Sequence, residues 1–131
     1  MKKIVNGSIL ISIMIIGISW FYSEVQRKQD LTNTMHNLRF IYNSINSYKE
    51  KNGYYPKPQS LKSLLNTLNL SEKRFFKTRI IDILTAVYHA PNQNTEFPFL
   101  TIEVKPTLLR RQRQRIVMKN DEAYYENVSK N

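Results

Sequence analysis

A cluster of arginines near the carboxyl end is the densest group of ligand-binding side chains in the sequence. Residues 110–115 hold four of them, Arg110, Arg111, Arg113 and Arg115, interspersed with glutamines. Guanidinium groups bind phosphates with little dependence on nucleotide sequence, so the cluster predicts a polyanion-binding patch, with DNA as the candidate partner. The Gln-Arg alternation is equally typical of a solvated strand, whose long charged side chains discourage pairing between sheet edges. Both interpretations follow from the residues alone.

Catalytic and metal-binding residues are sparse. The two histidines, His36 and His89, have no aspartate or glutamate nearby at the spacing of a triad or a metal site, and no glycine-rich phosphate loop occurs. Carboxylates cluster only at Asp121, Glu122 and Glu126, which offers few oxygen ligands for calcium. We therefore predict a protein that is not an enzyme and that uses no metal or cofactor.

Length and composition set broad limits. The chain has 131 residues, no cysteine, and 20 Lys and Arg against 10 Asp and Glu, a formal charge of +10. This length accommodates about one domain and an appendage. The lack of cysteine excludes a disulfide framework, a thiolate zinc site and a lipid-modified cysteine anchor. The basic charge suits phosphate polymers, anionic lipid headgroups or acidic protein faces.

The amino-terminal segment is apolar and uncharged from Ile4 to Tyr22. A helix of about 20 residues crosses the hydrocarbon core of a bilayer, so this segment predicts a single membrane span. Aromatic residues at its far end, residues 20–22, suit the headgroup level, and Lys2 and Lys3 before it predict a cytoplasmic amino terminus.

A cleaved secretory signal is the alternative interpretation of this segment. Gly17 and Ser19 provide a small-x-small cleavage site before Trp20. The apolar run is longer than a typical signal core, and cleavage would leave Trp-Phe-Tyr at the new amino terminus. We therefore favour the membrane span.

An amphipathic helix is predicted to continue the span. Its apolar side chains recur at steps of three and four residues: Leu31, Met35, Leu38, Ile41, Tyr42, Ile45 and Tyr48. No proline precedes Pro56, and no glycine lies between Gly17 and Gly53. The two segments can therefore form one rod from about Ser8 to Asn52, on the order of 65 Å long.

A hinge is predicted at the end of this rod, formed by Tyr48, Asn52, Gly53, Tyr55 and Pro56. A glycine after the last periodic residue closes a helix in the left-handed conformation, and a proline blocks its continuation. A short second helix follows, with Ser60 as its N-cap and one apolar face made by Leu61, Leu64, Leu65 and Leu68.

The rest of the chain has the short periodicity and turn residues of a small antiparallel sheet. We expect three or four strands, within Leu84–His89, Phe97–Val104, Arg115–Met118 and Ala123–Val128, and a loop or frayed turn at residues 73–77. The predicted fold class is α+β, with a long amino-terminal helix, a short second helix and a sheet packed on the long helix. Residues 8–30 would be the membrane helix and its exported extension, and residues 31–131 a globular head.

The hinge resembles a signature of pseudopilins, the small membrane-anchored subunits of type II secretion systems and related type IV pilus-like machines. The shared pattern is Tyr-x3-Asn-Gly-x-Tyr-Pro at Tyr48 to Pro56, followed by a second helix that begins near Ser60. It lies at a distance from the apolar segment that is similar to the distance in the family. The resemblance implies a pilin-like fold.

The amino terminus resembles a prepilin leader in part. Lys2, Lys3 and Gly7 precede the Ile-rich span, which implies a leader of residues 1–7 and cleavage after Gly7 by a prepilin peptidase, with Ser8 as the first mature residue. The chain departs from the family at Ser8 and Ser12, where phenylalanine and glutamate are usual. In the family that glutamate pairs with the amino terminus of a neighbouring subunit, and low dielectric strengthens such a pair.

The resemblance implies a structural protein of the bacterial inner membrane, with a single span and a periplasmic or extracellular head. Such a subunit would assemble with homologous pilin-like subunits, as a homo- or hetero-oligomer, into a short filament or at its tip. Two alternatives are a minor pilin-like subunit that binds DNA for an uptake machine through the arginine cluster, and a single-span protein outside any filament, which Ser12 favours.

Overall fold

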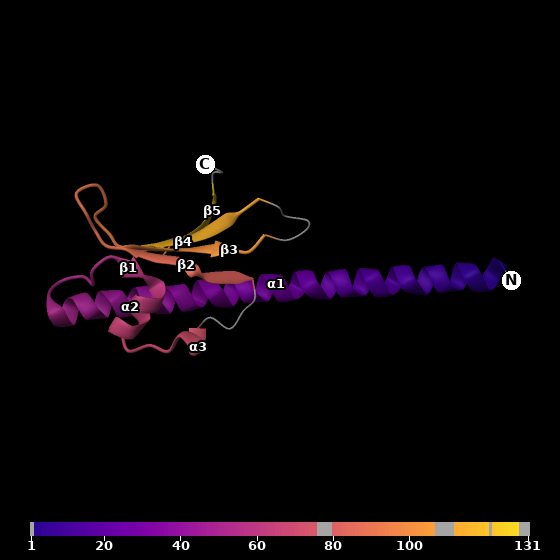
Figure 1. The fold of residues 1–131 in the computed structure, drawn as a ribbon, viewed down its shortest axis with the longest axis horizontal. Coiled ribbons are helices and arrows are strands. Elements are labelled where there is room, and N and C mark those ends of the chain that lie inside the picture. The colour runs from indigo at the N-terminus through magenta and orange to yellow at the C-terminus, as the bar shows by residue number, and fades with distance from the viewer. Residues whose placement is uncertain (1, 76–79, 107–111, 121, 129–131) are drawn as a thin grey trace.

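Helix α1, Lys2–Asn52, is the longest element of the chain. In the computed structural model, residues 2–75, 80–106, 112–120 and 122–128 are described, with the side chains of α1 described from Gly7 onward. The 51 residues of α1 correspond to about 75 Å at the usual rise per residue. The amino-terminal half projects beyond the rest of the molecule, and the other elements surround the carboxyl-terminal half (Figure 1).

The two halves of α1 have opposite surroundings. Large apolar side chains between Ile9 and Tyr22 are 52–69% exposed. In the carboxyl-terminal half, Leu38, Ile41 and Ile45 are fully buried. The predicted continuous rod and its apolar stripe are confirmed, because one uninterrupted helix carries both.

The end of α1 has the predicted cap geometry. Gly53 has a φ of +82°, and its N–H donates to the carbonyl of Lys49 over 2.7 Å. Pro56 is buried just beyond the turn. Helix α2, Leu61–Thr67, then begins with Ser60 as its N-cap, since the Ser60 hydroxyl accepts from the backbone N–H of Ser63 over 3.3 Å.

In the described part of the chain, five antiparallel strands form one sheet in the order β1-β2-β3-β4-β5. They are β1 (Gln59–Ser60), β2 (Ile81–His89), β3 (Phe99–Val104), β4 (Gln114–Lys119) and β5 (Glu122–Asn127). The α+β fold class and the four predicted strands are confirmed, with ends shifted by up to three residues. Two differences remain: β1 adds a fifth strand at the edge, and β2 starts earlier because an irregularity between Asp82 and Val87 lets Ile81 pair with Val104.

The hydrophobic core lies where the sheet and α2 meet α1. Alternate residues of the central strands face it, including Leu100 and Ile102 from β3 and Ile116 and Met118 from β4, all fully buried. From α2, Leu61, Leu64 and Leu65 complete it. Burial of each such side chain contributes roughly 1.5–3 kcal/mol before entropy is counted.

A third helix differs from the expected loop. Residues Glu72–Phe75 form α3, a single helical turn, while residues 76 and 77 of the predicted loop lie outside the described part of the chain. Phe75 is buried and stacks on Phe40 with ring centroids 5.5 Å apart. Its carbonyl accepts from Asn37 Nδ2 over 2.6 Å. These contacts tie α3 to α1, which is a tertiary reason for helix formation in so short a segment.

Candidate functional site

The candidate leader junction lies in the exposed amino-terminal half of α1. Gly7 and Ser8 are part of the continuous helix, and Ser12 Oγ donates to the Ser8 carbonyl over 2.9 Å. By length and composition this helix is apolar enough to cross a membrane, and none of its most apolar stretch is buried in the molecule. The junction and the apolar stretch therefore form one unpacked surface.

The hinge residues contact one another and the neighbouring residues Lys49 and Tyr54. Tyr48 and Tyr54 meet edge to face with ring centroids 6.0 Å apart, and a hydrogen bond with Tyr54 is the main cause that raises the pKa of Tyr48. Lys49 Nζ lies 4.5 Å from the centre of the Tyr55 ring. Asn52 Nδ2 donates to the Tyr48 carbonyl over 2.9 Å. The predicted hinge residues thus form a compact cap on the head.

The arginine cluster is only partly described. Arg110 and Arg111 lie outside the described residues. Arg115 Nε lies 3.0 Å from Glu126 Oε2 across β4 and β5, and Arg113 shares the wall of a small pocket of about 110 Å³ with Asp82 and Glu103. Both described arginines therefore have carboxylates near them on the surface, so this part of the surface is not a patch of positive charge alone.

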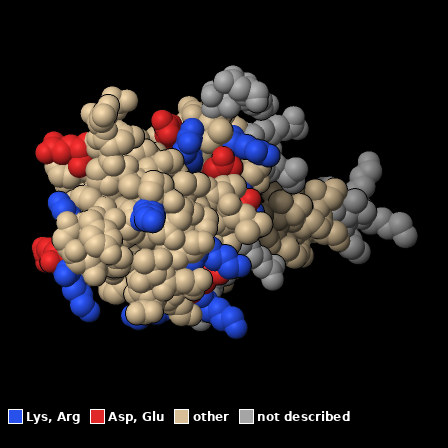
Figure 2. All heavy atoms as spheres, turned by 60° about the vertical axis from the view of Figure 1, so that its left-hand side comes forward, with Lys and Arg blue, Asp and Glu red and all other residues tan. Residues whose placement is uncertain are grey.

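The position of this cluster bears on the DNA prediction. The end of the sheet at which β3 ends and β4 begins points toward the amino-terminal half of α1 (Figure 1). Seen obliquely from the opposite end, the head has a mostly uncharged face with a basic side chain near its middle and basic and acidic side chains around its margin (Figure 2). DNA binding stays a prediction, and the described arginines lie on the side of the head from which α1 projects.

Neither histidine lies in a catalytic arrangement with the residues described around it. His36 is exposed on α1. His89 stacks on Phe99 with ring centroids 4.2 Å apart, and its Nε2 lies 3.3 Å from Thr101 Oγ1. Burial, and to a smaller extent the charge of Arg115, lowers the pKa of His89.

The predicted carboxylate cluster is divided. Asp121 lies outside the described residues, Glu122 begins β5, and Glu126 pairs with Arg115. Within the described residues no group of three or more His, Cys, Asp or Glu side chains is placed to hold a metal ion.

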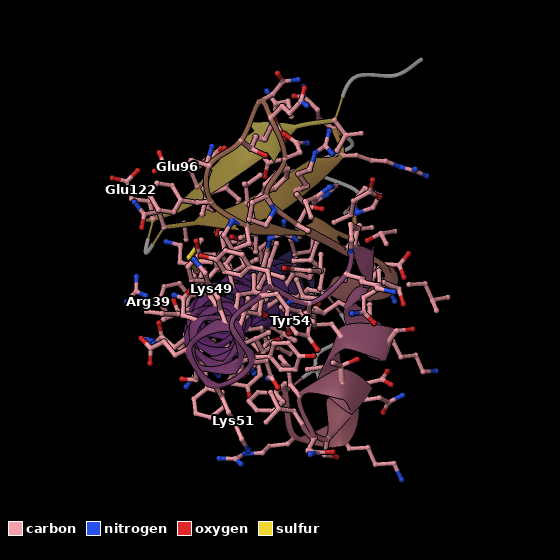
Figure 3. The ribbon with its side chains drawn as sticks, turned by 90° about the vertical axis from the view of Figure 1, so that its left-hand side faces the viewer. Arg39, Lys49, Lys51, Tyr54, Glu96 and Glu122 are labelled. Carbon is pink, nitrogen blue, oxygen red and sulfur yellow. The ribbon has the colours of Figure 1, made fainter. Side chains whose placement is uncertain are left out.

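A groove that the sequence did not reveal runs between α1 and the end of α2. Its volume is about 700 Å³, and its lining comes from two segments: Phe40, Asn43, Ser44, Ser47, Tyr48, Lys51 and Asn52 of α1, and Thr67, Leu68 and Asn69. Figure 3 looks along α1 from the hinge, with the sheet above α1, α2 beside it and Lys51 pointing away from the sheet. In the sequence, the only indication of this groove is the row of polar residues between the buried positions of α1.

Comparisons with protein-family models, with curated proteins and with solved structures gave no significant match. The function is therefore inferred from the geometry of the chain and from the resemblance of its hinge and amino terminus to pseudopilins. The geometry offers three surfaces: the exposed apolar half of α1, the head with its partly compensated arginines, and the groove between α1 and α2.

Proposed function

We propose that the chain is a pseudopilin-like structural subunit, held in the bacterial inner membrane by the amino-terminal half of α1. The proposal rests on one observation: the apolar side chains of α1 are exposed in its amino-terminal half and buried in its carboxyl-terminal half. Ile16 and Ile18 are 69% and 66% exposed, whereas Leu38 and Ile45 on the same helix are fully buried in the head. An apolar surface of this kind has its most favourable surroundings in lipid or against other helices.

The proposed mechanism is lateral association of the rods. In lipid, helices attract one another through van der Waals packing, because the hydrocarbon supplies no hydrophobic drive. A continuous α1 transmits the position of each membrane half to its head without a flexible joint, since no proline or positive-φ residue occurs in it before Gly53. Heads would then stack in register, with the amino terminus cytoplasmic and the head exported.

Processing of the leader tests the pilin-like part of the proposal. We expect mass spectrometry of the membrane-bound protein to find Ser8 as the first residue when a prepilin peptidase is present. A Gly7→Leu variant is the matched control, because Gly7 has no atom within 4 Å of an added Cβ and the substitution leaves the fold intact. Retention of Met1 in the native protein in the presence of the peptidase would contradict prepilin-type maturation.

A single-span protein outside any filament is the second candidate, and one observation favours it. The Ser12 hydroxyl is satisfied within its own helix by the Ser8 carbonyl, and serine carries no charge to offer a neighbour's amino terminus. This candidate shares the anchor and the head but predicts monomers in the membrane. Crosslinking between rods distinguishes the two.

DNA capture through the arginine cluster has a test of its own. The full chain in lipid nanodiscs is titrated with duplex DNA at several salt concentrations, beside an Arg113→Gln variant. Arg113 is exposed, so its loss leaves the fold intact. Binding that weakens with salt and in the variant would support DNA capture, and no binding at low salt would exclude it.

A further inference from the structure

The groove between α1 and α2 has the size of a ligand site. Its volume of about 700 Å³ lies within the usual range for small-molecule sites, about 300–1,000 Å³. In a chain in which 23% of residues are charged, Lys51 is the one charged side chain among the ten described residues that line it. The described lining therefore carries a single positive charge, whereas the whole chain carries a formal charge of +10.

Several polar groups in the groove are available to a ligand. Ser44, Asn52 and Thr67 donate to backbone carbonyls of their own helices and keep acceptor oxygens. The amides of Asn43 and Asn69 form no side-chain hydrogen bond with any described residue. Each amide offers two donors and an acceptor, so these two side chains present both kinds of hydrogen-bonding group without a charge of their own.

An aromatic ring supplies an apolar surface in the same groove. Phe40 remains 46% exposed although it stacks on Phe75, and the guanidinium of Arg74 lies 5.7 Å from its ring centre. These contacts fix the ring before any ligand arrives, which lowers the entropic cost of binding. Leu68, half-buried on the opposite wall, extends the apolar area.

We propose that this groove binds an uncharged carbohydrate. A sugar ring has flat apolar faces of C–H groups and a border of hydroxyls that both donate and accept. Phe40 matches the apolar face, and the amides of Asn43 and Asn69 match the border. A peptide that binds as an added strand would instead need an exposed sheet edge, and this groove is lined by side chains of α1 and of the end of α2. The site does not depend on filament assembly.

Saturation-transfer NMR on the full chain in lipid nanodiscs tests the site. The probes are chitotetraose, maltotetraose and an uncharged tetrapeptide amide, and maltoside detergents are avoided because their headgroups are sugars. We expect transfer to the ring protons of at least one oligosaccharide. The double variant Asn43→Ala/Asn69→Gly should weaken binding about tenfold, since two hydrogen bonds are lost. Glycine keeps the positive φ of 58° at position 69, so this variant folds.

The matched control is Asn33→Ala, which removes an exposed asparagine of α1 outside the groove and should leave the affinity unchanged. Absence of transfer to both oligosaccharides at millimolar concentration would overturn the proposal. Equal affinity in the double variant, or binding of the peptide alone, would do the same. None of these results depends on leader cleavage, so they are separate from the failure of the proposed function.

Discussion

Gly53 gives the sharpest test of the hinge, because its backbone conformation and its surroundings are both defined. Its φ of +82° is a conformation that L-amino acids rarely adopt, and an added Cβ would meet no atom within 4 Å. The cost of a side chain there is therefore backbone strain without a steric clash. A left-handed residue costs about 1–2 kcal/mol, and β-branched residues tolerate it least.

The expected magnitude follows from two opposing terms. In the folded state, backbone strain of about 1–2 kcal/mol, and somewhat more for valine, destabilises the variant. In the unfolded state, the added side chain lowers the chain entropy, which favours folding by about 0.4–1 kcal/mol. Gly53→Val should therefore lower the free energy of unfolding by about 1–2 kcal/mol, a fall of about 5–15 °C in Tm for a head of this size. Gly53→Asn should cost less than half as much, because asparagine tolerates positive φ.

Thermal unfolding of the full chain in nanodiscs, followed by near-ultraviolet circular dichroism of the tyrosines, measures these shifts. Gly17→Val is the matched control, since Gly17 also has free space around an added Cβ but lies within the regular part of α1. The control should leave the Tm of the head unchanged. A Gly53→Val protein that melts with the native protein would refute the cap, as would equal losses in the valine and asparagine variants.

Three further predictions concern the sheet. Tyr88 is fully buried, its hydroxyl has no hydrogen-bond partner among the described residues, and burial raises its pKa. Tyr88→Phe should therefore leave the free energy of unfolding in urea unchanged or raise it by up to about 1 kcal/mol. Burial lowers the pKa of His89, so the unfolded state binds the histidine proton more readily than the folded state does. The free energy of unfolding should therefore be highest above the pKa that His89 has in the unfolded chain, and should fall as the pH drops below that value. The variant His89→Gln should flatten this part of the pH–stability profile. Arg115→Gln breaks a half-exposed ion pair with Glu126, so it should lower the free energy of unfolding by less than about 1 kcal/mol at low salt and by still less at high salt. Comparison with the double variant that also changes Glu126 isolates the contribution of the pair.

The rod and the hinge could be predicted because their signals are local. The spacing of Leu38, Ile41 and Ile45 determines the buried face of α1, and the step from Asn52 to Gly53 determines where it ends. Both signals rest on residues close together in the chain. The four longer strands were likewise recognisable from β-prone runs between turn residues.

Features that depend on distant partners could not be predicted. Gln59 and Ser60 show no strand pattern, and they form β1 because Tyr88 and Val87 of β2 present an open edge. The helical turn α3 depends on Phe75 packing on Phe40, a contact 35 residues apart in sequence. The groove likewise joins two separated segments, and its polar residues have the ordinary pattern of a solvated helix face.

Crosslinking of rods in the membrane tests the proposed association most directly. The chain has no cysteine, so Ile11→Cys and Ile16→Cys introduce the only thiols, at exposed positions about 140° apart around α1. Associated rods should give a ladder of trimers and larger species with the double variant, whereas either single variant, as control, stops at dimers. Monomers alone from the double variant, at native expression and with an oxidant present, would contradict assembly of this chain with copies of itself.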